Sequence, residues 1–215
     1  SPDAVVIVVT NPLDPMTALM RAKLAFPARR VIGMAGMLDA ARFSWFLAEE
    51  LEVGVHDIDA MVLGAHGDSM VPMPRATTVN GIPVGELLDK PALTQLSERT
   101  KNGGGEIVNL LKTGSAFFAP ASGAVAMAKA ILRDEQRLLP CTCLLNGEFG
   151  FEGVYVGVPA VLGRAGVERI VELPLDTEAR IAMQKTVGAI QKDVGALRES
   201  GRVVPQLERA REALE

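Results

Sequence analysis

Aromatic residues are scarce in this chain of 215 residues, where phenylalanine, tryptophan and tyrosine together make up 4%. Hydrophobic residues still make up 48%, and nine residues are methionine, so we expect a largely aliphatic core. The 22% of charged residues is typical of an ordinary soluble globular protein. The length is enough for one large or two small domains with a substantial core.

Basic clusters and long apolar runs are also absent. The formal net charge is -4, and no block of lysine and arginine marks a nucleic-acid surface, so we expect no nucleic-acid partner. No apolar run approaches the roughly 18 to 20 residues of a spanning helix, so we expect no membrane partner. The first residues, SPDAVVIVVTNPLD, lack the basic region and the cleavage site of a signal peptide.

Cysteine is limited to Cys141 and Cys143 in the segment PCTCLL. This pair lacks the additional ligands of a metal site, so we expect no metal. We interpret the two residues as free thiols on a strand, in a protein of the reducing cytoplasm.

The chain opens with a pattern of alternating strand and helix. DAVVIVV, residues 3–9, is a β-branched run typical of a strand covered on both faces. Asp14 and Pro15 are expected to open a helix, and RRVIGM follows as a second strand. This order predicts a parallel α/β unit. Because a domain rarely begins in a buried central strand, we expect further strands upstream of this chain.

The remaining patterns predict helices, a hairpin and an antiparallel meander. Asn80-Gly81 is expected at the tip of the hairpin, and DAMVLGA is expected to be one strand. Three consecutive glycines, Gly103 to Gly105, are expected to loosen the helix predicted for residues 92–114. The meander is predicted within LLPCTCLLNG, FEGVYVGVPAVLG and GVERIVEL. The predicted helices cover residues 38–51, 92–114, 119–134 and 176–200.

His66, one of only two histidines, lies in the glycine-flanked segment GAHGDSMVP directly after the apolar DAMVLGA. A loop at this place can present an imidazole to a cleft, although a purely structural histidine fits the same pattern. The other histidine, His56, has no such setting and is interpreted as a surface residue.

Asp39 and Arg42 are three residues apart on a predicted helix, so both project from one face. Such a pair is often a solvated surface ion pair, but this helix is otherwise apolar, which favours a position facing a buried cleft. Asn11 ends a strand at the carboxyl edge, where open α/β sheets bind ligands, or it only makes a turn. Ser115, in KTGSAFFAP, lies at a polar kink or caps a helix.

Together these side chains suit hydride transfer to or from a secondary alcohol. A histidine can take the hydroxyl proton near neutral pH, and an adjacent aspartate sets its tautomer and stabilises the imidazolium. An arginine grips a substrate carboxylate with two parallel hydrogen bonds. The hydride itself needs a nicotinamide, since no side chain can supply it.

Four motifs, VTNPLD, GMLDAARF, GAHGDSMVP and LLKTGSAFFAPASG, resemble those of the malate and lactate dehydrogenase superfamily. The likeness runs to the region of Ser200 and is strongest to the lactate-dehydrogenase-like malate dehydrogenases. The resemblance implies NAD as the cofactor and a role for each candidate. These roles are acid/base for His66, orientation of that histidine for Asp39, substrate binding for Arg42, Asn11 and Ser115, and nicotinamide binding for Val9, Thr10 and Asn11.

The family's fold implies an α/β then α+β chain. Residues 1–35 would be the last strands of a parallel Rossmann sheet, the remnant of the dinucleotide-binding domain. Residues 36–215 would be the substrate-binding catalytic domain, with mixed helices and an antiparallel sheet. The implied activity is reversible oxidation of (S)-malate to oxaloacetate, in a homodimer or homotetramer whose subunit face includes the helix with Phe43, Trp45 and Phe46.

The 215 residues depart from the family in lacking the G-x-G-x-x-G turn, the acidic residue for the ribose and the mobile loop over the active site. The choice of malate or lactate as the substrate, and of NAD or NADP as the cofactor, therefore stays open. A lactate or other 2-hydroxyacid dehydrogenase, or a non-catalytic subunit, are the alternatives. We expect the chain alone to bind dinucleotide poorly and to be poorly active or inactive.

Overall fold

The structure is a computed structural model that describes residues 1–24, 26–114 and 116–199. The strands are β1 (Val6–Val8), β2 (Val31–Gly33), β3 (Ile58–Asp59), β4 (Val62–Gly64), β5 (Met70–Pro72), β6 (Thr78–Val79), β7 (Ile82–Pro83), β8 (Arg137–Asn146), β9 (Glu152–Gly163) and β10 (Gly166–Ile170). The α-helices are α1 (Leu13–Leu24), α2 (Gly36–Leu51), α3 (Val84–Leu87), α4 (Lys90–Leu111), α5 (Phe118–Leu132) and α6 (Thr177–Glu199).

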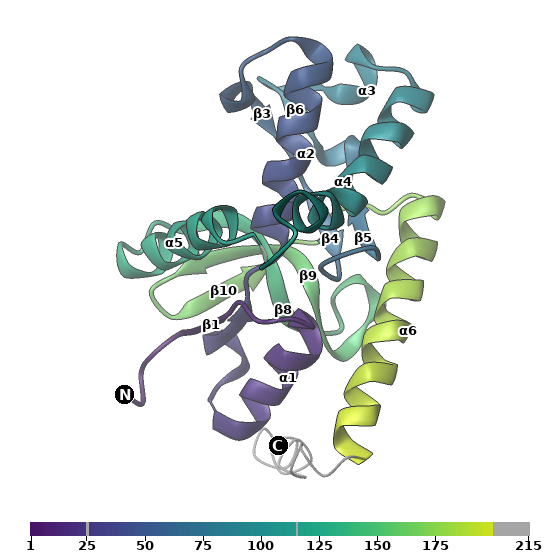
Figure 1. The fold of residues 1–215 in the computed structure, drawn as a ribbon. Helices are drawn as coiled ribbons and strands as arrows, with labels where there is room; N and C mark the ends of the chain where they lie inside the picture. The colour runs from purple at the N-terminus through teal and green to yellow at the C-terminus, as the bar shows by residue number, and fades with distance from the viewer. Residues whose placement is uncertain (25, 115, 200–215) are drawn as a thin grey trace.

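The larger sheet has the strand order β1-β2-β8-β9-β4-β5, with β10 paired to β9 (Figure 1). β1 and β2 are parallel and joined by α1, which confirms the predicted α/β unit. β8, β9 and β10 are antiparallel neighbours, which confirms the meander. β2 pairs with β8 through Gly33 and Thr142, so the parallel unit and the meander share one sheet.

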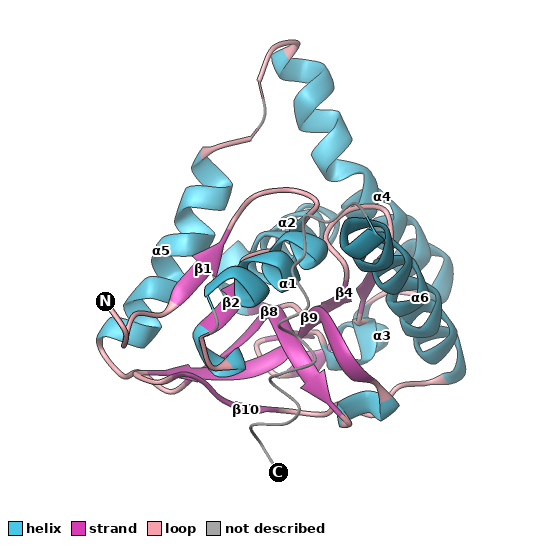
Figure 2. Cartoon of the chain, turned by 90° about the horizontal axis from the view of Figure 1, so that it is seen from below, coloured by secondary structure: helices cyan, strands magenta, loops and turns pink. Residues whose placement is uncertain are grey.

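An aliphatic core fills the space around β8 and β9. Cys141 and Cys143 point to the same side of β8 and are buried there as free thiols, as predicted. Met127 of α5 and Met183 of α6 are fully buried in the same core. α1 and α6 pack against each other and both contact β9, while α5 lies on the opposite side of the molecule from α6 (Figure 2).

The segment DAMVLGA is divided between the two sheets, so the expectation of one strand was wrong. β3 pairs with β6 in the small sheet β3-β6-β7, whereas β4 pairs with β5 and β9. Between them, the Met61 amide donates to the Thr77 hydroxyl and the Met61 carbonyl accepts from the Met73 amide. The side chains of this segment alternate between the two cores: Ala60 and Val62 pack in the small core, and Met61 and Leu63 pack in the main one.

The small core lies between α2, α4 and the small sheet, and α2 and α4 run side by side in it (Figure 1). Phe43 and Phe46 are buried there, and only Trp45 is exposed, at 55%. Of the three aromatics on this helix, Trp45 alone is therefore available to a subunit face, and whether α2 forms such a face stays a prediction. The predicted hairpin is present, with positive φ at Asn80 and Gly81.

α4 continues without a break through its three glycines, so the expected loosening was wrong as well. A side chain at Gly103 would contact Phe46 and the Arg42 side chain of α2. α4 packs on α2 along this segment, and this tertiary contact offsets the weak helix propensity of the glycines.

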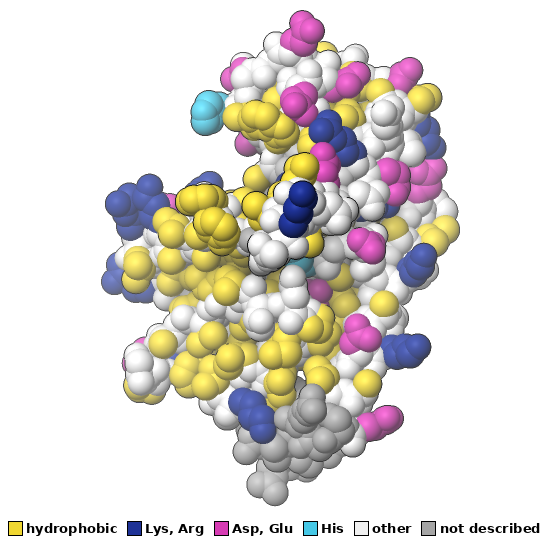
Figure 3. Space-filling model, viewed as in Figure 1, with side chains coloured by type: hydrophobic (Ala, Val, Ile, Leu, Met, Phe, Trp, Pro, Cys, Tyr) yellow, Lys and Arg dark blue, Asp and Glu magenta, His cyan; other side chains and the backbone are white. Residues whose placement is uncertain are grey.

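Exposed apolar side chains gather on one face of the molecule (Figure 3). The end of α4 and one face of α5 contribute to the exposed apolar surface. Its members on these two helices and the residue preceding α5 are Val108, Leu110, Leu111, Phe117, Phe118, Val125 and Leu132. Within the described residues no helix is long and apolar enough to cross a membrane.

Gly157 of β9 faces Gly64 of β4, two residues before His66. A Cβ at Gly157 would overlap the Gly64 carbonyl oxygen, so we expect Gly157→Ala to destabilise the fold by roughly 1 to 3 kcal/mol. Chemical denaturation measures this change. Gly188→Ala in α6 is the control, since its Cβ meets open space and alanine favours a helix. Equal midpoints for both variants would contradict the close strand contact.

Candidate active site

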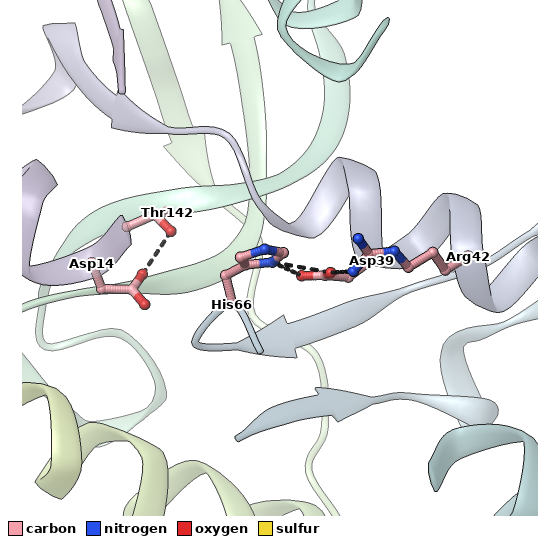
Figure 4. A network of polar contacts seen from close by, with 5 residues as sticks. All are labelled: Asp14, Asp39, Arg42, His66 and Thr142. Atoms are coloured by element: carbon pink, nitrogen blue, oxygen red, sulfur yellow. Dashed lines mark hydrogen bonds and ion pairs between the residues drawn. The ribbon is translucent and has the colours of Figure 1, made fainter. Parts of the chain in front are cut away.

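His66 lies in the turn between β4 and β5. Gly67, directly after it, has a φ of 109°, a left-handed conformation that glycine adopts without strain. The turn therefore reverses the chain immediately after His66, and the imidazole projects toward the start of α2 (Figure 4). The side chain is 18% exposed, which leaves it accessible to a small molecule but largely shielded from water.

Asp39 lies in the first turn of α2 and is 2% exposed. Its two carboxylate oxygens lie 3.1 and 3.0 Å from Nδ1 of His66 (Figure 4). An ionised carboxylate only accepts hydrogen bonds, so Nδ1 carries the proton in this pair. The other ring nitrogen, Nε2, is then the position that exchanges a proton.

The surroundings of His66 raise its pKa above the usual 6.5. The hydrogen bond to Asp39 is the main cause; burial lowers the pKa, and the charge of Asp39 raises it again. Arg42 lowers the pKa and Asp14 raises it. The site therefore favours the imidazolium, the form that a proton donor needs.

Arg42 follows Asp39 by one helical turn, and its Nη1 donates to Asp39 Oδ1 over 3.3 Å. The side chain is 12% exposed, so this is a largely buried pair and the solvated surface pair is excluded. Nε of Arg42 is buried and has no hydrogen-bond partner within the described residues. An unpaired buried donor is costly, by about 1 to 3 kcal/mol, so an acceptor from a bound molecule would stabilise this side chain.

The helix α4 packs directly against this guanidinium. A Cβ at Gly104 would lie 3.5 Å from Nη1 of Arg42, and one at Gly103 would lie 3.5 Å from its Cδ. Both distances are ordinary van der Waals contacts, so this segment of α4 forms one wall of the space around Arg42.

Val9, Thr10 and Asn11 follow β1 at its carboxyl end and are exposed. They precede α1 by a single residue, Pro12, and α1 carries Asp14, whose charge acts on His66. An exposed apolar side chain and an exposed amide at this edge fit the flat, partly polar nicotinamide ring. The prediction for Ser115 lies outside the described residues.

Asp14 is a site residue that the sequence pattern missed, since it suggested only the opening of a helix. It is 2% exposed and accepts a hydrogen bond of 2.7 Å from the hydroxyl of Thr142 on β8. Burial raises the pKa of Asp14 to about 6, against lowering by Thr142 and His66. The signal in the sequence was its place as the last residue of the VTNPLD motif, three residues after Asn11.

A concavity between β5, α4 and the start of α6 contains none of these side chains. Its charged residues pair with one another: Lys90 with Glu178 at 2.7 Å and Arg75 with Asp176 at 3.7 Å. It therefore lacks the unpaired buried donor that marks the His66 site. No group of three or more metal-ligating side chains is found within the described residues.

Comparisons with known proteins identify the family of this chain. Residues 36–199 match the family of the lactate/malate dehydrogenase, alpha/beta C-terminal domain. The malate dehydrogenase of Roseiflexus castenholzii is 53% identical over 199 residues, which cover 93% of this chain and 64% of that protein. The chain thus spans less than two thirds of the length of this relative.

Solved structures show the same fold. The malate dehydrogenase of Salinibacter ruber is 46% identical, with a TM-score of 0.89 over 94% of this chain and 67% of that one. The lactate dehydrogenase of Eimeria maxima, solved with NADH and oxamate, is 38% identical, with a TM-score of 0.89 over 93% and 64%. These matches confirm the predicted fold class. The chain belongs to the lactate/malate dehydrogenase family, as a homologue of its lactate-dehydrogenase-like malate dehydrogenases.

Proposed function

We propose that this chain is the C-terminal portion of an NAD-dependent malate dehydrogenase, which interconverts (S)-malate and oxaloacetate. The observation that carries the proposal is the contact of His66 with the buried Asp39, beside an arginine with an unpaired buried Nε. In this proposal residues 1–35 end a dinucleotide-binding domain and residues 36–215 form the substrate-binding catalytic domain. The malate dehydrogenases among the relatives favour malate as the substrate.

His66 is the acid and base of the reaction. Asp39 holds the proton on Nδ1, so Nε2 can accept the hydroxyl proton of malate and return it to oxaloacetate in the reverse direction. The imidazolium that forms is stabilised by the carboxylate beside it. NAD, when bound, supplies the acceptor for the hydride that leaves the same carbon.

Arg42 holds the substrate. Its Nη1 contacts Asp39, and its buried Nε lacks an acceptor within the part of the chain that the structure describes. A substrate carboxylate can accept from Nε and from the neighbouring terminal nitrogen at once, which fixes the orientation of the reacting carbon. Ser115 would line the same pocket.

Val9, Thr10 and Asn11 would hold the nicotinamide end of the cofactor, with the Asn11 amide contacting both the ring and the substrate. These exposed residues lie at the carboxyl edge of a parallel strand pair, the usual ligand edge of such sheets. No phosphate-binding glycine turn occurs in the sequence, so the fit concerns the nicotinamide end alone.

A homodimer or homotetramer is part of the proposal. The exposed apolar residues of α4 and α5 support it, because an apolar surface of this kind on one face is typical of an interface. Trp45 on α2 adds to the exposed apolar surface.

A chimera tests the activity. The part of the R. castenholzii malate dehydrogenase that precedes the matched region is joined to this chain, and NADH oxidation is measured with oxaloacetate and with pyruvate. We expect turnover of oxaloacetate at least about 100-fold faster than that of pyruvate, with a dimer or tetramer in sedimentation. The 215 residues alone are expected to be poorly active.

The controls separate the alternatives. His66→Gln in the chimera is expected to abolish turnover, which shows that the activity comes from this chain. Because the added part supplies the active-site loop of a malate enzyme, a preference for oxaloacetate agrees with the proposal without excluding a lactate dehydrogenase, whereas a preference for pyruvate would favour one. A folded chimera that is inactive with both substrates would favour a non-catalytic subunit.

A further inference from the structure

Asp14 is a buried carboxyl that the proposed reaction leaves without a role. It lies in the first turn of α1 and is 2% exposed. Its one side-chain partner in the described structure is the hydroxyl of Thr142, which donates to Oδ1 over 2.7 Å and is itself fully buried. A helix cap at the surface would need no such partner, so burial of this carboxyl serves another purpose.

The imidazole of His66 lies between two carboxylates. Asp39 and Arg42 of α2 are on one side, and Asp14 with Thr142 is on the other (Figure 4). The charge and the backbone amide of His66 both act on Asp14, and the charge of Asp14 acts on His66. The arrangement therefore couples the start of α1 to the histidine turn across the sheet.

We propose that Asp14 is a second positioning residue for His66, which holds the histidine turn against α1 and stabilises the imidazolium from the side opposite Asp39. This inference rests on the proposed role of His66 as the acid and base. Asp14 acts through the histidine and touches no reacting atom.

A purely structural contact would not need a charged side chain at position 14. A neutral asparagine could accept the same hydrogen bond from Thr142 without the penalty of burying a carboxylate. Burial raises the pKa of Asp14 to about 6, so the carboxyl is still mostly ionised at pH 7. The charge of Arg42 disfavours the imidazolium of His66, and the negative charge of Asp14 offsets this effect.

Histidine titration by NMR tests the inference in the 215-residue chain. The two Hε1 signals report His66 and His56, and His56 is exposed and serves as the internal reference. We expect Asp14→Asn to lower the pKa of His66 by on the order of half a pH unit and to leave that of His56 unchanged. Asp193→Asn, at an exposed position of α6, removes the same charge far from the site and should change neither.

Thr142→Val provides a second variant that keeps the carboxyl. Without the hydroxyl, the pKa of Asp14 rises further, so Asp14 is neutral over more of the range in which His66 titrates. We therefore expect the pKa of His66 to fall in this variant too. It also answers the question if Asp14→Asn does not fold.

The inference is overturned if the pKa of His66 is unchanged in folded Asp14→Asn, and Asp14 is then only a structural contact. If Asp14→Asn does not fold, an unchanged pKa in Thr142→Val has the same meaning. The titration needs neither cofactor nor substrate, so its result stands apart from the activity of the chimera. In the active chimera, Asp14→Asn is expected to move the loss of oxaloacetate reduction to lower pH, because the protonated histidine is the proton donor. A shift to higher pH would contradict the inference.

Discussion

Asp39→Asn in the chimera is expected to lower kcat for oxaloacetate reduction by about 10³- to 10⁴-fold while the protein stays folded. Both carboxylate oxygens of Asp39 face Nδ1 of His66. An asparagine amide can present its NH₂ group there, which favours the tautomer with the proton on Nε2 and removes the charge that stabilises the imidazolium. Binding of the substrate should change much less than turnover, because Arg42 stays in place.

Asp39→Asn is also expected to change how the free energy of unfolding depends on pH. The folded-state pKa of His66 is raised, so its contribution to stability is fully present below the unfolded value near 6.5. That contribution is lost as pH rises through the folded pKa. We expect Asp39→Asn to reduce the difference in unfolding free energy between pH 5.5 and 8.5, measured by urea denaturation.

The kinetic prediction for Asp39→Asn has its own contradicting outcome. A decrease in kcat of less than tenfold, with Asp193→Asn unaffected, would show that His66 works without its carboxylate.

Arg42→Lys is expected to lower kcat/KM for oxaloacetate by about 10²- to 10³-fold, equivalent to about 3 to 4 kcal/mol. Lysine keeps the positive charge near Asp39, but it cannot offer the two parallel donors that orient a carboxylate. The loss should appear in KM and in kcat together, because the misplaced substrate also reaches the hydride and proton positions less often. Initial rates over a range of oxaloacetate concentrations separate the two.

Arg99→Lys is the matched control for this substitution. Arg99 lies on α4 over the ring of Phe46 at 4.0 Å and pairs with Glu49 at 3.2 Å, near the exposed end of the helix pair. Its replacement is expected to leave kcat/KM within about twofold, since surface ion pairs contribute little. If Arg42→Lys were equally mild, Arg42 would be only a structural partner of Asp39.

Several elements of the fold followed from local patterns. The β1-α1-β2 unit, the hairpin at Asn80-Gly81 and the meander of β8 to β10 each depend on residues that are close in the sequence. The same holds for Asp39 and Arg42, because a spacing of three puts both on one helical face whatever the rest of the chain does. The family resemblance then indicated which of these side chains belong together.

The errors concern contacts between distant parts of the chain. α4 stays helical through its glycines because α2 packs on it, and Phe43 and Phe46 are buried by the same contact. DAMVLGA is split because its start pairs with β6 in the small sheet and its end pairs with β5 and β9 in the large one. Local propensity is weak compared with such packing.

The sequence by itself therefore determined the class of chemistry: a histidine in a glycine-flanked turn, a carboxylate and arginine on one helical face, and a strand-end amide. Only the tertiary structure decided how these side chains meet. It placed Nδ1 of His66 3.0 Å from Asp39, left Nε of Arg42 buried and unpaired within the described residues, and joined Asp14 to Thr142 across 128 positions. Hydrogen bonds and burial depend on distances between residues far apart in the chain, and those distances exist only once the sheet has formed.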